Sequence, residues 1–304
     1  MAQCFRLGWR RCSPLNWALD LTGKLGHMDK FYHYTNIGGL LGILQYKKLW
    51  LSSIANMNDH QEVIWLRNKF YSRLTELVGK QDFDEKRLEL IGSFWQMMSH
   101  PEPTPYICCF SKNGDLLSQW RAYSSDGEGA CIRFNVNKLG VEQGIPYMHP
   151  KLEYSMRYSR VVYEEEQTQA FITEMIVELM KIVDALAEGD NNQMIKLSEL
   201  ANQCSRASYI FKNSAFSEEQ EIRIVHTPFI DNNNNKWFGN ASEVKFRECA
   251  GSITSYFEFG FSTEAVEEVI LGPKCRCSIN ELNLLLRSYD YQGVTVSKSS
   301  ASYR

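Results

Sequence analysis

The fold begins with residues 31–44, which read Phe31-Tyr32-His33-Tyr34-Thr35, then Asn36, then Ile37-Gly38-Gly39-Leu40-Leu41-Gly42-Ile43-Leu44. The first five residues are aromatic or β-branched, which predicts a short strand ending near a helix cap at Asn36. Apolar residues from Ile37 to Leu44 recur at the helical period, and Lys47 and Lys48 suit the last turn of that helix. Leu49-Trp50-Leu51-Ser52 then predicts a second strand. The segment is a compact strand-helix-strand unit.

Farther along the chain, helical and strand patterns follow one another irregularly. Two amphipathic helices are predicted within residues 60–99, after a turn and cap at 56–59, and two more within residues 165–211, with a break at 189–192. Further strands are expected over 105–110, 130–134, 154–163, 219–225, 253–259, 267–271 and 293–297, and shorter helices over 116–123 and 279–287. The regular alternation of a doubly wound fold is missing. We therefore predict an α+β protein with a mixed, largely antiparallel sheet.

The domain organisation follows from the same patterns. One domain is expected over residues 28–304, with helical insertions near 60–99 and 165–211. Residues 1–27 precede the first patterned segment and are predicted to be a loosely ordered arm or an extension of the start site. Arg10, Arg11, Ser13 and Pro14 interrupt any apolar segment that a signal peptide would need.

Bulk composition excludes several classes of function. The 304 residues carry a formal net charge of -3, so the broad basic footprint of a general nucleic-acid binder is missing. The nine cysteines show no C-x-x-C spacing, and no two histidines lie close enough to form a local metal motif, so no metal is predicted. No apolar run is long enough to span a bilayer. We expect a soluble cytoplasmic protein with reduced thiols; the sequence leaves its oligomeric state open.

The strongest polar pattern lies in residues 216–225, Phe-Ser-Glu-Glu-Gln-Glu-Ile-Arg-Ile-Val. If this segment is a strand, Glu219, Glu221 and Arg223 share one face, and the two carboxylates stand roughly 7 Å apart. Like charges that close raise one pKa and can keep a general base available, while Arg223 opposes that effect. The alternative is a solvated strand face with a ladder of salt bridges.

Five other residues, in three places along the chain, are candidates for a ligand site. His33 ends a strand, where it can present its imidazole to a cleft or serve as a hydrogen-bonded structural residue. Trp120 and Tyr123 lie three residues apart on a short helix and can stack on a flat ring, although core packing is commoner for tryptophan. Ser52 and Ser53 can donate to a ligand or make turn contacts. No phosphate-binding loop, nucleophile elbow or metalloprotease motif occurs.

Seven short motifs, read in order, resemble the bacterial family catalogued as domain of unknown function 2971. The motifs are Tyr32-His33-Tyr34-Thr35, Leu49-Trp50-Leu51-Ser52-Ser53 with Asn58-Asp59, Cys109-Phe110-Ser111, Trp120-Arg121-Ala122-Tyr123, Glu219-Gln220-Glu221-Ile222-Arg223, Ile270-Leu271-Gly272-Pro273 and Ser302-Tyr303-Arg304. The resemblance covers roughly residues 31–304. It supplies no function by itself.

A looser resemblance is to the ADP-ribosyltransferase superfamily, in which an early His or Arg, a central aromatic or Ser and a late Glu-x-Glu follow one another. His33, Tyr123 and Glu219-x-Glu221 stand in that order, although no clear Ser-Thr-Ser motif occurs and the helical insertions exceed a minimal core. The resemblance implies an ADP-ribosyltransferase-like fold and NAD as substrate. The residues that it implies for NAD binding are His33, Tyr34, Thr35, Ser53, Trp120, Tyr123 and Arg223.

The same resemblance implies roles for the site residues. Glu221 would stabilise the oxocarbenium-like transition state, and Glu219 would orient or deprotonate an acceptor, whether protein, nucleic acid or water. His33 would hold a ribose hydroxyl and Tyr123 would stack on nicotinamide. We then expect an NAD-dependent ADP-ribosyltransferase or NAD glycohydrolase, as in toxins and phage-defence effectors, and Glu221→Gln should abolish turnover with the fold nearly intact. The alternative is a non-catalytic nucleotide-binding or regulatory module with a structural ion-pair network.

Overall fold

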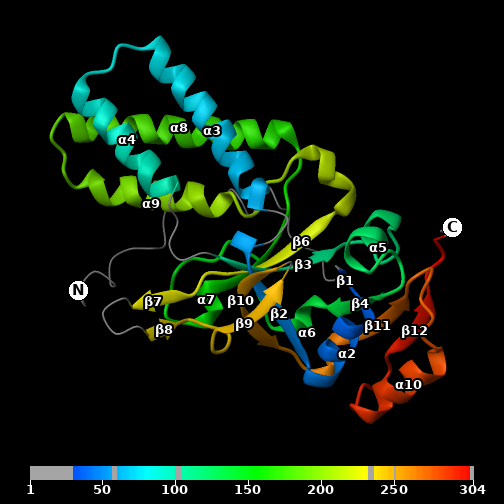
Figure 1. The fold of residues 1–304 in the computed structure, drawn as a ribbon. Helices are drawn as coiled ribbons and strands as arrows, with labels where there is room; N and C mark the ends of the chain where they lie inside the picture. The colour runs from blue at the N-terminus through cyan, green and yellow to red at the C-terminus, as the bar shows by residue number, and fades with distance from the viewer. Residues whose placement is uncertain (1–29, 57–59, 100–104, 232–235, 250, 302–304) are drawn as a thin grey trace.

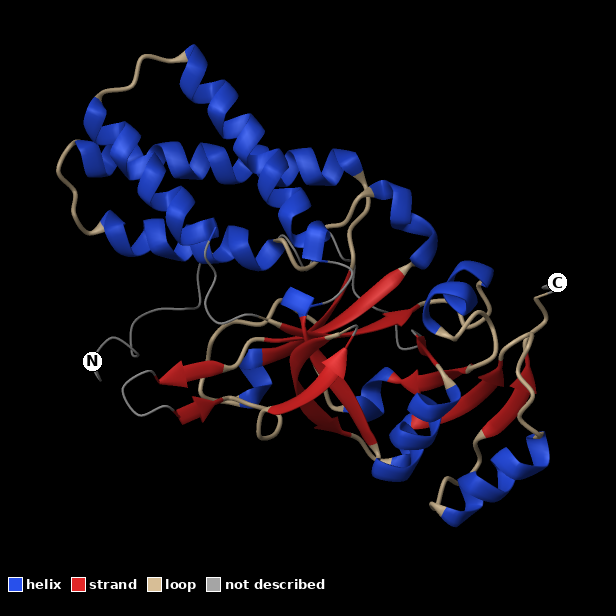
Figure 2. Ribbon diagram, viewed as in Figure 1, coloured by secondary structure: helices blue, strands red, loops and turns tan. Residues whose placement is uncertain are grey.

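The computed structural model describes residues 30–56, 60–99, 105–231, 236–249 and 251–301. Within these ranges ten strands form one sheet, in the order β12-β11-β4-β1-β3-β2-β10-β9, with β6 paired to β3 and β5 paired to β6. The strands are β1 (Lys30–Thr35), β2 (Lys48–Ser53), β3 (Tyr106–Ser111), β4 (Ala130–Asn135), β5 (Met156–Arg160), β6 (Glu221–His226), β9 (Lys245–Cys249), β10 (Ser252–Gly260), β11 (Val266–Leu271) and β12 (Thr295–Lys298). Only β11 and β12 pair in parallel within the described part of the sheet. The predicted α+β class with a mixed, largely antiparallel sheet is confirmed (Figure 2).

The opening strand-helix-strand unit forms as the sequence predicts. The Asn36 side chain accepts a hydrogen bond from the Gly39 amide at 2.7 Å and caps α2 (Ile37–Tyr46). Leu40 and Leu44 of α2 are buried in the main core. The helix ends at Lys47 in the left-handed conformation, with φ at 54°, and Lys48 already belongs to β2. The two lysines therefore terminate the helix rather than extend it.

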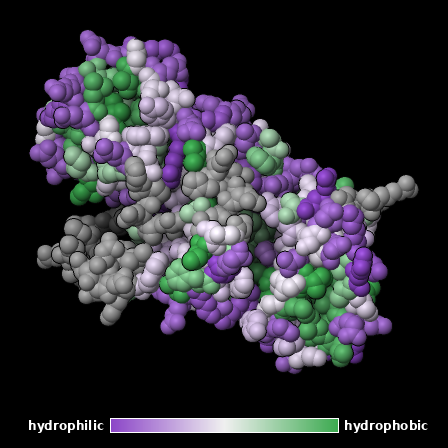
Figure 3. Space-filling view, viewed as in Figure 1, coloured by the Kyte–Doolittle hydropathy of each residue, from purple (hydrophilic) through white to green (hydrophobic). Residues whose placement is uncertain are grey.

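The two predicted helical insertions pack against each other and form one layer beside the sheet (Figure 1). The first contributes α3 (His60–Lys80) and α4 (Glu85–Ser99), and the second contributes α8 (Glu165–Ala187) and α9 (Gln193–Ala207). They share a hydrophobic core that includes Phe70, Phe94, Phe171 and Leu197. Hydrophilic side chains form much of the outer surface of this layer, with a smaller apolar area among them (Figure 3). Each helix pair buries its apolar stripe against the other pair. The two insertions therefore form a hydrophobic core of their own beside the core of the sheet.

Shorter elements complete the chain: α5 (Leu117–Tyr123), α6 (Val136–Leu139), α7 (Leu152–Ser155), α10 (Ile279–Ser288), and the 3-10 turns η2 (Ile54–Asn56), η3 (Ser214–Glu219) and η4 (Thr263–Ala265). A small hairpin of β7 (Phe229–Asp231) and β8 (Lys236–Phe238) and the edge strand β9 were not predicted. The predicted strand over 154–163 is shorter, because Tyr154 lies in α7. The predicted polar loop at 232–235, most of the predicted cap at 56–59 and the arm at 1–27 lie outside the described residues.

The predicted strand over 219–225 is wrong at its beginning. Glu219 ends η3, Gln220 adopts the left-handed conformation with φ at 46°, and β6 starts at Glu221. The alternation of charged and apolar residues gives no sign of the turn at Gln220, because a polar glutamine is compatible with both a strand face and a turn. Glu219 and Glu221 therefore approach each other across a turn instead of along one strand face.

The sheet divides along one edge of β3, and this division positions the site. At one end of β3, Ser111 pairs with Tyr32 of β1. At the other end, Ile107 and Tyr106 pair with Ser52 and Ser53 of β2. Among the described strands, neither β1 nor β2 pairs with residues 108–110 along this edge, although β6 pairs with β3 along its whole other edge. A cleft consequently opens between β1 and β2 over the middle of β3.

Candidate functional site

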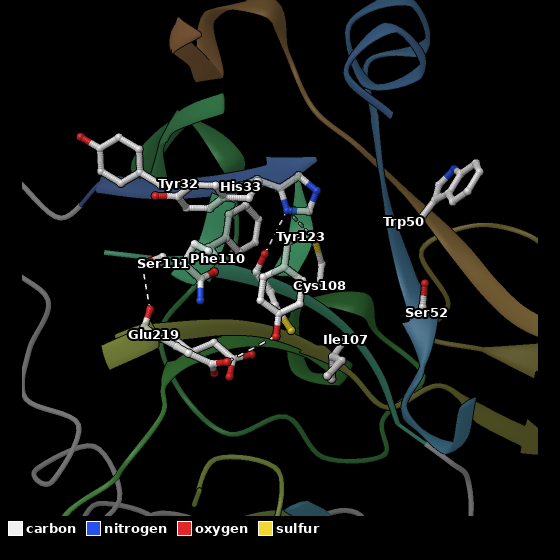
Figure 4. Close-up of a pocket in the computed structure, with 14 residues that line it drawn as sticks. Tyr32, His33, Trp50, Ser52, Ile107, Cys108, Phe110, Ser111, Tyr123 and Glu219 are labelled. Carbon is white, nitrogen blue, oxygen red and sulfur yellow. Dashed lines mark hydrogen bonds between the residues drawn. The ribbon is translucent and has the colours of Figure 1, made fainter. Parts of the chain in front are cut away.

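A cavity of about 180 Å³ occupies the place where β1 and β2 diverge. Its walls come from β1, β2, β3, α5, η3 and β6, and Figure 4 shows several of these side chains facing one another. The lining residues are Tyr32, His33, Tyr34, Trp50, Ser52, Ile107, Cys108, Cys109, Phe110, Ser111, Gln119, Tyr123, Glu219 and Glu221. The fold thus gathers His33, Tyr123, Glu219 and Glu221, which are separated by up to 188 positions in the sequence, around one space.

His33 bridges the gap between β1 and β3. Its Nδ1 atom lies 2.9 Å from the backbone oxygen of Cys109 (Figure 4). A carbonyl oxygen only accepts, so Nδ1 carries the proton and donates it. Burial lowers the pKa of His33, and the bond to Cys109 opposes that shift only in part, so the imidazole is neutral. The Nε2 atom is then an acceptor that can receive a hydrogen bond from a ligand hydroxyl.

Glu221 is held at the back of the cavity by Arg223. The two carboxylate oxygens accept hydrogen bonds from Nε and Nη2 of Arg223, each at 2.8 Å. Arg223 is fully buried, and its Nη1 atom donates to the backbone oxygen of Tyr209 at 3.0 Å. This bidentate pair is the geometry in which arginine binds a carboxylate most strongly. Arg223 therefore lies behind Glu221 and does not line the cavity.

The ionisation of Glu221 follows from these contacts. Burial alone would raise its pKa, but the charge and hydrogen bonds of Arg223, the charge of Lys212 and a hydrogen bond from the Cys109 thiol outweigh burial and lower the pKa to about 2. Glu221 is thus a fixed anion throughout the physiological pH range, and it cannot serve as a general base near neutral pH.

Stability should therefore depend on Glu221 in acid. A carboxylate with a lowered folded-state pKa stabilises the fold fully above its ordinary value of 4.5, and this contribution is lost as the pH falls toward about 2. We expect the free energy of unfolding of the wild-type protein to decrease more steeply over this interval than that of Glu221→Gln. Urea unfolding at a series of pH values measures both slopes; parallel slopes would contradict the assignment.

Glu219 is the more accessible of the two carboxylates, with 17% of its side chain exposed against 7% for Glu221. One oxygen accepts a hydrogen bond from Lys212 at 2.5 Å, and the other lies 3.4 Å from the Tyr123 hydroxyl (Figure 4). Ser111 donates to the Glu219 backbone oxygen at 2.8 Å and fixes the turn. The Lys212 ammonium also lies 3.4 Å from Glu221, so one buried cation connects both carboxylates.

Tyr123 and Tyr34 contribute aromatic surface to the cavity. Tyr123 is 44% exposed, and its ring lies beside the labelled carboxylate of Glu219 in Figure 4. Tyr34 lines the cavity but is mostly buried, and its hydroxyl donates to the backbone oxygen of Asn113 at 2.9 Å. Of these two tyrosines, Tyr123 is therefore the one with surface available to a ligand.

Trp120 does not line the cavity, and the prediction that it stacks on a ligand beside Tyr123 requires correction. It is fully buried, its indole nitrogen donates to Asp115 at 2.7 Å, and its ring meets Tyr34 edge to face at 4.8 Å. On a short helix, a residue three positions from an exposed one can still face the core. Thr35 and Ser53, the last residues of β1 and β2, are likewise outside the lining.

Several lining residues could not be identified from the sequence. Cys108 and Gln119 stand in none of the motifs, and Cys109 stands in one but was given no role in the site. Lys212 does not line the cavity, and it reaches Glu219 because the chain after α9 turns back toward β6. Burial raises the pKa of the Cys108 thiol to about 12, so this sulfur is not a thiolate nucleophile. Ser52 lines the cavity, as does the exposed aromatic residue Trp50 on the same strand. The sequence predicted Trp50 as part of a strand but gave it no role in the site.

Two further properties concern the described residues as a whole. No group of three His, Cys, Asp or Glu side chains among them is placed to hold a metal ion. None of the helices in the described ranges is both long and apolar enough to cross a membrane.

Residues 119–224 match the model of a family described as a protein of unknown function (DUF2971). This segment contains Tyr123, Glu219, Glu221 and Arg223, whereas His33 and the β2 residues of the cavity precede it. The match supports the resemblance to that family seen in the sequence. No curated protein and no solved structure matches the chain.

Proposed function

We propose that the protein cleaves the bond between nicotinamide and ribose in NAD and passes the ADP-ribosyl group to water or to a macromolecular acceptor, protein or nucleic acid. The observation that carries this proposal is the convergence of four polar and aromatic side chains on one cavity: His33 from β1, Tyr123 from α5, Glu219 from η3 and Glu221 from β6. A cavity on which a few polar and aromatic groups converge is the common form of a ligand-binding or catalytic site.

The chemistry needs negative charge beside the ribose. When the C1′–N1 bond breaks, its electron pair goes to the nicotinamide nitrogen, which becomes neutral, and positive charge develops on C1′ and the ring oxygen. A carboxylate held nearby stabilises this transition state more than the ground state. Addition of a hydroxyl group to C1′ completes the transfer, and its proton leaves to a base.

The contacts favour Glu219, rather than Glu221, as the carboxylate that acts on the reacting atoms. Both oxygens of Glu221 are engaged by Arg223, which offsets its charge, whereas Glu219 is more exposed and has one oxygen directed to Tyr123. We assign to Glu219 the stabilisation of the developing cation or acceptance of the proton. Glu221 remains an ionised group behind it and, through Lys212, helps fix its orientation.

Tyr123 and His33 would position the substrate. The exposed ring of Tyr123 offers a surface on which the nicotinamide can stack, and the Nε2 acceptor of His33 can receive a hydrogen bond from a ribose hydroxyl.

The direct test is nicotinamide release from NAD by the purified protein, with and without cell lysate as a source of acceptor. Release without lysate indicates glycohydrolase activity, and release that requires lysate indicates transfer to an acceptor. Loss of cellular NAD during expression would agree with a toxin or phage-defence role. Absence of release under both conditions, by protein that is folded, would rule out NAD cleavage.

Replacement of His33 should affect substrate binding more than chemistry. His33→Phe removes the neutral imidazole acceptor and keeps an aromatic ring, and loss of one hydrogen bond of about 1 kcal/mol predicts an increase in KM for NAD of roughly fivefold with a small change in kcat. Initial rates over a range of NAD concentrations measure both constants. A large fall in kcat at unchanged KM would instead place His33 in the chemical step.

The Glu221–Arg223 pair favours a second candidate, a non-catalytic nucleotide-binding module. A fully satisfied bidentate pair is also what a structural network would contain. This candidate predicts that NAD or another nucleotide binds without nicotinamide release, which calorimetry and the release assay distinguish.

A further inference from the structure

The cleft has a second, basic end on β2, β10 and β9. The register places Ser52 opposite Tyr256, Trp50 opposite Glu258, and Arg247 opposite Thr254. Partners across antiparallel strands project from the same face, and this face carries Trp50 and Ser52 of the cavity lining. Figure 4 shows both side chains on β2, across the cleft from Glu219. The sheet face that lines the cavity with Trp50 and Ser52 therefore continues across β10 to Arg247 on β9.

Charge on this face is unbalanced. Lys48 and Lys245 both bind the single carboxylate of Glu258, at 2.5 and 3.0 Å. Arg247 forms no ion pair with any carboxylate in the part of the chain that the structure describes. Two lysines thus share one carboxylate, and Arg247 has none among the described residues, which favours an anionic ligand beside Arg247.

Arg247 is also held in position before a ligand arrives. Its Nη2 atom donates to Ser52 Oγ at 3.2 Å, and its guanidinium lies 5.3 Å from the centre of the Trp50 ring. Within the described ranges, its Nε atom and the Thr254 hydroxyl are buried without a hydrogen-bond partner. Thr254 is 1% exposed and lies directly opposite Arg247. Buried donors without partners are costly, so an acceptor group bound here would be stabilising.

Trp50 adds an aromatic surface to this basic end. It is 47% exposed, and its ring packs against Tyr256 with centroids 4.6 Å apart. A half-exposed indole fixed beside an arginine is suited to contact a nucleobase while the guanidinium binds a phosphate.

We propose that Arg247, Ser52, Thr254 and Trp50 form a nucleotide subsite, in which Arg247 binds a phosphate group and the exposed part of Trp50 contacts the base. The nucleotide is either the ADP half of NAD, an assignment that rests on the proposed function, or a nucleotide of the acceptor. Both share the chemistry of a base with an attached phosphate.

The test is calorimetric titration of the wild-type full-length chain and its variants with ADP and, separately, with adenosine. We expect ADP to bind, and Arg247→Gln to weaken its binding by roughly tenfold or more, because a charge-assisted hydrogen bond is lost. Adenosine should bind weakly to both proteins, because it lacks the phosphates. Trp50→Leu should also weaken the binding of ADP. Arg287→Gln, which alters an exposed arginine on α10, should leave the binding of ADP unchanged.

Two further measurements identify the source of the nucleotide. Competitive inhibition of nicotinamide release by ADP would assign the subsite to the ADP half of NAD. Displacement of ADP by a short single-stranded oligonucleotide, without inhibition of release by ADP, would assign it to an acceptor. If ADP binds through Arg247 but no nicotinamide is released, the proposed function fails and the subsite stands. Failure of ADP to bind, or equal affinity of folded Arg247→Gln, overturns the subsite.

Discussion

Glu219→Gln is expected to reduce nicotinamide release from NAD by roughly 10²–10⁴-fold, the range found when a group that stabilises charge or transfers a proton is removed. The amide has nearly the same shape and can still accept the hydrogen bond from Lys212. The protein should therefore remain folded, with a loss of stability of about 1–2 kcal/mol from the weaker contact with a buried ammonium. Release rates and urea unfolding of the same preparations separate the two effects.

Glu218→Gln is the matched control for this substitution. Glu218 precedes Glu219, is exposed, accepts a hydrogen bond from Ser118 at 3.0 Å, and does not line the cavity. The same chemical change one residue away should leave nicotinamide release within about twofold of wild type, as expected for a surface substitution. Equal loss of activity in both variants, or full activity of Glu219→Gln, would contradict the assignment of Glu219.

Glu221→Gln is expected to destabilise the fold by about 3–5 kcal/mol, because it leaves the buried guanidinium of Arg223 without a charged partner. This differs from the sequence-based expectation that the substitution leaves the fold nearly intact. A glutamine can accept one hydrogen bond from Arg223 but cannot balance its charge. Urea unfolding monitored by tryptophan fluorescence measures the loss, and activity must be assayed well below the unfolding midpoint.

A second substitution distinguishes ion-pair loss from altered packing. Arg223→Met in the Glu221→Gln background removes the unpaired cation and fills part of its volume, so the double variant should recover stability relative to Glu221→Gln. Additive losses from the two substitutions would show that Glu221 and Arg223 are not energetically coupled. Recovery of stability without recovery of activity would show that the negative charge of Glu221 matters beyond its contribution to the fold.

These experiments also separate the two candidate functions. An NAD-cleaving enzyme requires activity to depend on Glu219 when stability is retained, whereas a binding module requires no turnover and an effect of Glu221 on stability alone. The two carboxylates can be told apart because Lys212 contacts both, whereas Glu221 is also held by the bidentate contact with Arg223.

Local periodicity was sufficient for most elements of this chain. The strand at 31–35, the cap at Asn36 and the paired helices within 60–99 and 165–211 follow from side-chain patterns that depend on near neighbours in sequence. The turn at Gln220 was missed because a left-handed residue next to a strand leaves the alternation of polar and apolar residues unchanged. The edge strand β9 was missed because its sequence, Lys245 to Cys249, is mostly polar and its pairing with β10 supplies the order.

Side-chain patterns were enough to predict the α+β class and a short set of candidate site residues that included His33, Tyr123, Glu219 and Glu221. Tertiary structure alone decided which of them meet, because the division of the sheet at β3 depends on strand pairing between distant segments. It also buried Trp120, placed Arg223 behind Glu221, and brought Lys212 and Arg247 to opposite ends of the cleft. Burial and charge pairing set these roles, and both depend on contacts made through space rather than on spacing along the chain.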